Sequence, residues 1–354
     1  MKRVAIITIT NSGLNFGNRL QNYALQESLS KYGIKVETIF SSNECCHSLI
    51  LSIGRRIAKR IVKNEKRRRK FREFNRKYIN NAKKVRYGKI NEKIFNNMYD
   101  AFIAGSDQVW NPSYKFNSNF EYMAFAPKEK RYSYSASFGV SDIPIEKQAS
   151  IRALLNDMHA ISVREESGAK IVKELTGREA EIHVDPTMLL KKEDYFRMEK
   201  GVERPLPEHY LLVYFLGYIT DEYRKFIDEL ANKLKSEVVE LSETKGSKFY
   251  NIGPQQFLYM IHHANYICTD SFHGSVFSVL FEKPITIFVR KDHDVPTNSR
   301  IETLMDKLEI REREFGSLDV NNSIKKINYN RVNELLEEER RSAFKYLKKI
   351  CKEW

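Results

Sequence analysis

Apolar and polar positions alternate near the start of the chain in a way that predicts strand, helix and strand. The apolar, β-branched run from Val4 to Thr10 is typical of a buried strand in a parallel sheet. Residues 19–32 carry apolar side chains at helical spacing, and Gly33 follows as a helix stop. A second apolar run covers residues 34–40. Together these segments predict a parallel β-α-β unit with a right-handed crossover.

The alternation continues to the end of the chain. Short apolar runs predict further strands at residues 99–104, 131–138, 160–164, 181–185, 210–215, 237–241, 264–268 and 284–288. Helical spacing predicts helices at residues 151–158, from 165 onward, 221–234, 253–261, 276–280, from 299 onward and 332–353. Between residues 186 and 207 the apolar pattern lapses among prolines and charges, which predicts a linker between two domains.

The length of 354 residues is too great for one ordinary core, and hydrophobic residues make up 42% of the chain, enough for two. We therefore predict an α/β fold with two Rossmann-like domains facing each other across a cleft, by analogy with many sugar-transferring enzymes. The expected domains are residues 1–190, with a basic helical insertion at 41–90, and residues 205–325. A C-terminal helix within residues 326–354 is expected to pack back on the first domain.

The net charge of +14 comes from one segment. Residues 55–86 contain 16 lysines and arginines against Glu65 and Glu73, so the remainder of the chain is formally neutral. Apolar residues recur among these charges at helical spacing and predict a basic amphipathic helix pair. They are Ile53, Ile57, Ile61, Val62, Phe71, Phe74 and Tyr78. The pair can be a solvated helical face, a surface for anionic membranes or lipid phosphates, or a nucleic-acid site. We expect no nucleic acid, because no recognised nucleic-acid motif accompanies the charge.

The chain shows neither a membrane span nor a disulfide framework. No run of about 18 apolar residues is present, and the N-terminal apolar run is too short for a signal peptide. The four cysteines have neither metal-ligand nor disulfide spacing. These features predict a protein of the reducing cytoplasm.

A polar stretch from Thr269 to Gly274 lies between a predicted strand and a predicted helix, where an open α/β fold places its sites. Ser271 or Thr269 can cap the helix, whose free N–H groups would face an anion. His273 can exchange a proton near neutral pH. Equally, Asp270 and Ser271 can serve only as caps, with His273 a partly buried structural histidine.

Other polar residues at strand ends extend this candidate site. Arg164 and Arg300 can hold a small dianion, since arginine stays charged and binds phosphate or carboxylate bidentately. Asp107 and the loop from Asn15 to Asn18 also fall at strand ends. The loop lacks the G-x-G-x-x-G pattern of dinucleotide sites, and no HExxH, CxxC, P-loop or G-x-S-x-G element is present. The carboxylates form no clear metal cage, so no metal is expected.

Each of these residues also has a structural interpretation. Arg164 can pair with Glu165 or Glu166 on a surface helix, and Asp107 can cap a following helix. The side chains of Asn15, Asn18 and Gln21 can satisfy backbone groups in a turn, and Asp185-Pro186 is expected to be architectural. Four other histidines show no partner pattern and are expected to be structural or exposed. They are His183, His262, His263 and His293.

Six short motifs in order give the chain a family resemblance. They are Asn-Phe-Gly-Asn-Arg-Leu-Gln at 15–21, Ala-Gly-Ser-Asp-Gln-Val-Trp-Asn at 104–111, Ile-Ser-Val-Arg-Glu at 161–165, Val-Asp-Pro-Thr at 184–187, Thr-Asp-Ser-Phe-His-Gly at 269–274 and Asn-Ser-Arg-Ile at 298–301. With these motifs the chain resembles the polysaccharide pyruvyl transferase family. The resemblance implies a glycosyltransferase-B-like fold. It also implies transfer of a pyruvyl group from phosphoenolpyruvate to two hydroxyls of a sugar, forming a cyclic ketal and releasing phosphate.

The resemblance also implies roles for individual residues. His273 matches the catalytic histidine and Arg164 the phosphoenolpyruvate binder. Better-known members carry a basic residue two positions before the histidine, where this chain has Ser271, so we expect Arg300 to complete the anion contacts. The candidates are His273 for catalysis; Arg164, Ser271, Phe272, Gly274 and Arg300 for the donor; and Asn15, Asn18, Asp107 and Gln108 for the acceptor. The first domain is thus the acceptor side and the second the donor side, with phosphoenolpyruvate as co-substrate and no other cofactor.

The basic segment suggests where such an enzyme works. Acceptors in capsule and exopolysaccharide pathways are often linked to polyprenyl diphosphates at the inner face of the membrane. Residues 55–86 are therefore expected to hold the enzyme there as a peripheral protein. Two alternatives remain open from the sequence. One is a glycosyltransferase that uses a nucleotide sugar, with Glu302 as a candidate ribose ligand, and the other is a non-enzymatic basic membrane-binding module.

Overall fold

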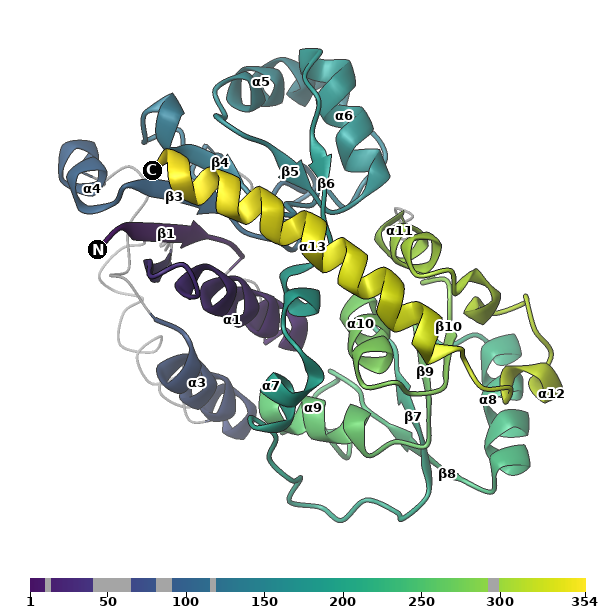
Figure 1. Ribbon diagram of the computed structural model, residues 1–354. Helices are drawn as coiled ribbons and strands as arrows, with labels where there is room; N and C mark the ends of the chain where they lie inside the picture. The colour runs from purple at the N-terminus through teal and green to yellow at the C-terminus, as the bar shows by residue number, and fades with distance from the viewer. Residues whose placement is uncertain (10–13, 41–64, 81–90, 115–118, 292–298) are drawn as a thin grey trace, which may run out of the picture. The chain divides into compact units, whose positions relative to one another are not determined.

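The structure, a computed structural model, describes residues 1–9, 14–40, 65–80, 91–114, 119–291 and 299–354 (Figure 1). The chain divides into two compact units. The first consists of Met1–Leu189 with Ser342–Trp354, and the second of Leu190–Arg341.

The first unit is built on a parallel four-stranded sheet in the order β2-β1-β3-β4. Its strands are β1 (Arg3–Ile7), β2 (Lys35–Ile39), β3 (Ala101–Ala104) and β4 (Arg131–Ser133). Helix α1 (Phe16–Ser30) connects β1 to β2, so the predicted parallel β-α-β unit is confirmed. Residues 4–7 of β1 are fully buried, as expected for a continuous apolar run in a central strand.

A smaller parallel pair continues this unit. Strands β5 (Ser162–Val163) and β6 (Glu181–Ile182) pair in parallel, and a bridge from Tyr132 to Ala160 links them to the end of the main sheet. Helices α5 (Ile145–Asn156) and α6 (Glu166–Thr176) lie side by side on this part of the unit (Figure 1). The pair matters for function because it carries Arg164 at its carboxyl end.

The second unit has the same strand order. Its strands are β7 (Tyr210–Tyr214), β8 (Glu237–Glu240), β9 (Tyr266–Thr269) and β10 (Ile285–Ile287), all parallel and ordered β8-β7-β9-β10. Its helices are α7 (Lys192–Phe196), α8 (Asp221–Leu234), α9 (Pro254–His262), α10 (Phe272–Leu280), α11 (Ser299–Lys307) and α12 (Val320–Ser323).

This shared order fixes where polar loops gather in each unit. The first strand of each sheet lies between the second and the third, so successive connections run toward opposite edges. The carboxyl ends of two central neighbours, β1 and β3 in one unit and β7 and β9 in the other, therefore form a topological switch point. Ligands in open α/β sheets bind at such points.

The predicted linker at residues 186–207 is largely folded. It begins with the short helix η3 (Pro186–Leu189), and the division between the units falls after Leu189. Helix α7 follows at once, and its Tyr195 is buried against the ring of Phe277 at 5.0 Å between centroids. Residues 186–190, Tyr195 and Met198 are buried, whereas residues 199–207 contain no buried side chain.

The basic segment is described only in part. Helix α3 (Lys66–Tyr78) is amphipathic as predicted, with Phe71 and Phe74 buried and the Phe71 ring 5.5 Å from that of Phe16. This apolar stripe packs within the first unit, so it is not free to enter a membrane. The other predicted helix, with Ile53, lies outside the described residues.

The last helix, α13 (Tyr329–Glu353), contributes to both units, since its residues from Ser342 onward group with the first. There the hydroxyl of the buried Tyr346 donates to the Ser133 carbonyl at 2.8 Å. Among the described residues, none of the helices combines the length and apolar character that a membrane span requires.

Candidate functional site

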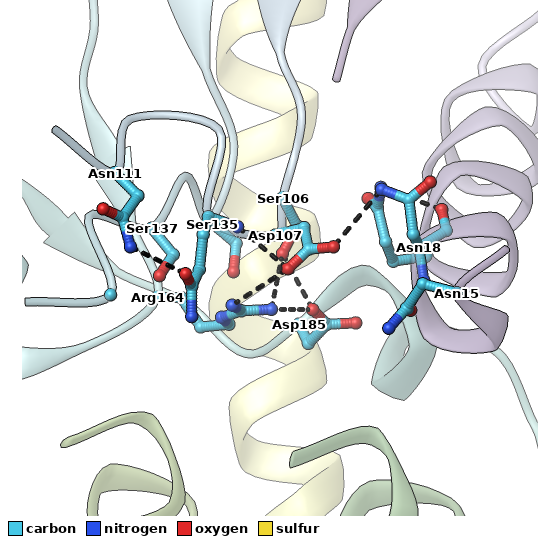
Figure 2. A network of polar contacts seen from close by, with 12 residues as sticks. Asn15, Asn18, Ser106, Asp107, Asn111, Ser135, Ser137, Arg164 and Asp185 are labelled. Carbon is cyan, nitrogen blue, oxygen red and sulfur yellow. Dashed lines mark hydrogen bonds and ion pairs between the residues drawn. The ribbon is translucent and has the colours of Figure 1, made fainter. Parts of the chain in front are cut away.

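The first candidate cluster lies at the switch point of the first unit, just after β3. Figure 2 shows Ser106, Asp107, Arg164 and Asp185 pointing toward one another there. The Ser106 hydroxyl donates to Asp185 Oδ2 at 2.8 Å, and its carbonyl accepts from the Thr8 hydroxyl at 3.0 Å. The loop after β3 is thereby tied both to the end of β1 and to the loop after β6.

Arg164 is the charged centre of this cluster. It follows β5 and is only 3% exposed. Its Nη1 donates to Asp185 Oδ2 at 2.6 Å and to the Ser106 hydroxyl at 3.2 Å, while Nη2 lies 3.9 Å from Asp107 Oδ1. Arg164 Nε also lies 3.9 Å from Glu165 Oε2, so the expected pairing with Glu165 is present. The expected surface location is wrong, since both side chains are buried and the shortest contact is with Asp185.

Asp185 and Glu165 hold the geometry around Arg164. Asp185 Oδ1 accepts from the backbone N–H and the hydroxyl of Thr187, at 3.0 and 2.7 Å. The fully buried Glu165 uses Oε1 to accept from the Ser137 hydroxyl and the Phe138 N–H, both at 2.9 Å. Glu165 thereby fixes the loop after β4. Its place beside Arg164 in a motif was the only sign of this role in the sequence.

The acceptor candidates gather on the other side of Asp107. The carboxylate Oδ2 accepts from Asn18 Nδ2 at 3.2 Å, and Oδ1 accepts from the Gln108 N–H at 2.9 Å. Asp107 has a φ of 70° and turns rather than starting a helix, so the helix-cap alternative for it is wrong. Asn15 does have a structural role, because its side chain caps α1 by accepting from the Asn18 N–H at 2.9 Å.

Gln108 and Gln21 are bonded within the same region. Gln108 Oε1 accepts from Asn111 Nδ2 at 2.7 Å and from the Tyr114 hydroxyl at 2.6 Å. Gln21 donates to the Thr8 hydroxyl at 2.8 Å and to the Asn18 carbonyl at 3.1 Å. The amides therefore form a buried, hydrogen-bonded layer around Asp107.

Arg19 joins this layer although it was not singled out beforehand. It is buried, and its Nη1 donates to Asn18 Oδ1. Burial lowers the pKa of the Arg19 guanidinium to about 10, and the negative charge of Asp107 opposes that shift. Its only sequence signal was its place in the motif at 15–21.

The second cluster lies at the switch point of the second unit, around the start of α10. Ser271 is the helix cap, and its hydroxyl accepts from the Gly274 N–H at 3.2 Å. The Thr269 hydroxyl accepts from the Ser271 N–H at 3.0 Å and donates to the Tyr214 carbonyl at 2.5 Å. A Cβ on Gly274 would lie 2.5 Å from that hydroxyl oxygen, so the turn requires glycine there.

Asp270 is not a cap of α10. Its two carboxylate oxygens accept from the backbone N–H groups of Leu216 and Gly217, at 2.7 and 2.8 Å. Arg290, after β10, places Nε 3.8 Å from Asp270 Oδ2. Asp270 thus fastens the loop after β7 to the end of β9, a role that sequence reasoning missed because its partners are remote in the chain.

His273 and Arg300 meet around Phe272. His273 lies in the first turn of α10, 7% exposed, with its ring 5.2 Å from that of Phe272. Arg300, in the first turn of α11, holds its guanidinium carbon 5.7 Å from the centre of the Phe272 ring. The structure therefore gathers Ser271, Phe272, His273, Gly274 and Arg300 in the second unit, and Arg164 with the acceptor candidates in the first.

A comparison with protein families identifies the chain. The model for polysaccharide pyruvyl transferase matches residues 15–292, which is most of its length. The chain belongs to the polysaccharide pyruvyl transferase family. The chain is therefore a transferase of polysaccharide biosynthesis. This excludes the alternative of a non-enzymatic membrane-binding module. A comparison with curated proteins finds no match.

Solved structures support the fold. A UDP-GlcNAc 2-epimerase from Methanocaldococcus jannaschii is similar with a TM-score of 0.53 and 11% identity, over 95% of this chain and 92% of that one. An alpha-glucosyltransferase in complex with UDP and a 13-mer DNA gives 0.50 and 10%, over 98% and 94%. At such identities the likeness concerns the fold alone, and it confirms the predicted glycosyltransferase-B-like α/β architecture.

Proposed function

We propose that this pyruvyl transferase uses phosphoenolpyruvate as its donor and forms a cyclic ketal on two hydroxyls of a sugar, releasing phosphate. One observation carries the proposal beyond family membership. At the switch point of the second unit, an acid–base histidine and an arginine adjoin the same residue, Phe272, at a helix N-terminus. Such a place combines a proton donor with groups that bind an anionic donor.

The chemistry balances with His273 as the general acid–base. His273 gives a proton to the vinyl carbon of phosphoenolpyruvate, which becomes a methyl group, and the adjacent carbon becomes an oxocarbenium-like electrophile. A sugar hydroxyl adds to that carbon and returns a proton to the histidine. A second hydroxyl then forms the other C–O bond as the C–O bond to phosphate breaks, and its proton leaves with the phosphate.

Donor binding falls to two arginines and a helix start in this mechanism. In the second unit, Arg300 would bind an anionic group of the donor. In the first unit, Arg164, whose orientation is fixed by Asp185, is the donor binder that the family resemblance assigns. The Ser271 hydroxyl is engaged as the α10 cap, so Ser271 would contribute its place in the turn rather than a charge. The backbone N–H groups of the first turn, including that of Phe272, would stabilise the leaving phosphate.

On the acceptor side, we assign the sugar to the layer around Asp107. Asp107 would accept hydrogen bonds from sugar hydroxyls, with Gln108 orienting it through its backbone N–H, and Asn18 would donate to a ring or hydroxyl oxygen. Asn15 would act indirectly, by capping the helix that carries Asn18. The acceptor would be a lipid-linked polysaccharide precursor, and exposed basic residues of α3 would draw the enzyme to the anionic membrane.

Donor-dependent phosphate release tests this function. We expect phosphate release, and an added pyruvyl mass on the sugar, with phosphoenolpyruvate but not with nucleotide sugars. The nucleotide-sugar alternative predicts release of a nucleoside diphosphate and an added sugar mass with nucleotide sugars, and no reaction with phosphoenolpyruvate. Its candidate ligand Glu302 is an exposed residue of α11. H273Q should lower turnover by at least about a hundredfold, since general acid–base catalysis supplies about 10²–10⁴. Near-normal turnover by this variant would show that His273 has another role.

A further inference from the structure

Three potential metal ligands meet in the second unit, outside the clusters described above. Glu199 follows α7, while His262 ends α9 and His263 comes next. Helices α7 and α9 pack against each other (Figure 1). One ligand atom from each residue lies within 4.8 Å of the other two. The two histidines showed no partner pattern in the sequence, but in the structure both lie next to Glu199, which is far from them along the chain.

The distances within this cluster suit a shared ion. His262 Nδ1 lies 2.9 Å from Glu199 Oε1, and His263 Nε2 lies 3.7 Å from Glu199 Oε2. Zinc binds nitrogen and oxygen at about 2.0–2.2 Å, so tetrahedral ligands on one zinc ion lie about 3.4 Å apart. The two observed distances lie on either side of that value, and small side-chain rotations would equalise them.

The two closest ligand atoms do not form a hydrogen bond with each other. Glu199 Oε1 and His262 Nδ1 are both buried, yet neither makes a hydrogen bond within the described part of the chain. Their 2.9 Å contact is therefore an approach without hydrogen-bond alignment, which is expected of two ligands aimed at a common point. Unsatisfied buried polar atoms are rare and require an explanation.

The surroundings hold the three ligands in place. The His262 ring stacks on Phe196 at 3.8 Å between centroids, with 9° between the planes. The segment that carries Glu199 is tied to α9, because Gln255 Nε2 donates to the Met198 carbonyl at 2.6 Å. A metal site needs this kind of support to fix its ligands.

Charge and protonation in the cluster also fit a cation. Burial is the main cause that lowers the pKa of both imidazoles; the charge of Lys283 lowers both further, and Glu199 opposes the shift of His263. Burial raises the pKa of Glu199 to about 7, against the opposing charges of His263 and Lys283, so its carboxylate lacks solvation that a cation would replace. Lys283 would repel the ion, whereas the charge of Lys192 is already paired with Glu282 at 2.7 Å.

We propose that Glu199, His262 and His263 bind one divalent ion of the zinc class, with water completing the coordination. Two imidazoles and a carboxylate are ligands that zinc accepts, and three protein ligands leave a position for water. The ion would fasten the segment after α7 to the end of α9 inside the second unit. The site is independent of the proposed donor chemistry, so either can fail without the other.

Zinc titration of the full-length, tag-free protein tests the proposal. After removal of metals with a chelator, calorimetry at pH 7.5 should show one equivalent of zinc bound, and zinc should raise the Tm by about 5 °C. H263A and E199Q should each weaken this binding at least about tenfold. The Tm of E199Q without metal checks that it folds, and H263A removes a half-exposed ring whose loss the fold tolerates.

A second histidine–glutamate pair supplies the matched control. His159 Nε2 lies 3.3 Å from Glu353 Oε2 in the first unit, and no third ligand from the described residues joins this pair in a metal-type cluster. H159A should therefore bind zinc as the wild type does. The proposal is overturned if the wild type takes up no zinc, or if H159A reduces the uptake and H262A and H263A leave it unchanged.

Discussion

Arg164 and Asp185 form a buried ion pair in which each residue depends on the other. Their 2.6 Å contact is sealed from solvent, and a third group, the Ser106 hydroxyl, bonds to both. A buried ion pair adds little net stability. Removing one partner, however, leaves the other charge buried and unpaired, which lowers the free energy of unfolding by about 3–5 kcal/mol. At the scale of the residue, Asp185 is therefore best understood as a positioning residue for Arg164.

Substitution of Arg164 separates binding from folding. R164A should weaken phosphoenolpyruvate binding at least about tenfold, measured by calorimetry, and should also lower the free energy of unfolding by about 3 kcal/mol. Arg178 offers a matched control, because it donates to the carbonyls of Leu155 and Met158 at 2.8 and 2.7 Å, away from the cluster. R178A should lose stability and keep its donor affinity. An unchanged affinity in folded R164A would remove Arg164 from the donor site.

At the scale of the element, the start of α10 is a tightly packed turn. Thr269, Ser271 and Gly274 interlock, since the Thr269 hydroxyl is bonded on both sides and leaves no room for a Cβ at position 274. The position of His273 in the first helical turn depends on this packing. The start of α10 thus provides both the helix N-terminus that we propose to face the anion and the position of the proposed catalytic residue His273.

G274A tests that packing. Alanine is the better helix former by about 1 kcal/mol, yet we expect a net loss of about 1–3 kcal/mol in the free energy of unfolding, because the new methyl group overpacks the turn. The double variant T269A/G274A should lose less than the sum of the two single variants, measured by urea denaturation. G201A is the control, because no atom lies within 4 Å of its added Cβ and its stability should not fall. Strict additivity would contradict the proposed clash.

At the scale of the whole molecule, the pattern of apolar runs was enough to predict the strands, the longer helices of the second unit and the parallel β-α-β order, but not the short helices α7 and α12. Parallel strands are buried on both faces, so their sequences carry a strong local signal. The contacts that build the sites carry none. Asp185 with Arg164, Asp270 with the amides after β7, and Glu199 with two histidines join loops that meet only when the sheets are assembled. Family motifs therefore located the site residues, whereas their partners required the structure.

The charge distribution is also a property of the whole chain, and the structure changes how its membrane role should be tested. Deleting residues 55–86 would remove α3, whose Phe71 and Phe74 are buried in the first unit, and so would damage the fold. Because that apolar stripe is occupied, membrane attraction by α3 must come from charge. Reversal of exposed basic residues of α3 is the sharper change. Suitable positions are Arg68, Arg72, Arg76 and Lys77.

We expect the wild type to co-sediment with anionic vesicles at low salt and to dissociate as salt is added, since each basic residue near the surface contributes about 1 kcal/mol. The fourfold glutamate variant of α3 should lose at least about tenfold in binding while retaining turnover on a soluble acceptor. A matched fourfold reversal of exposed lysines and arginines on α13, at Arg341, Lys345, Lys348 and Lys349, controls for total charge and should bind more strongly than the α3 variant. Equal losses of vesicle binding in the α3 and α13 variants would mean that the net charge of the protein, and not a particular face, causes the binding. Binding that ignores salt and lipid charge would refute membrane attraction by this segment, because electrostatic attraction to a surface must weaken as counterions screen it.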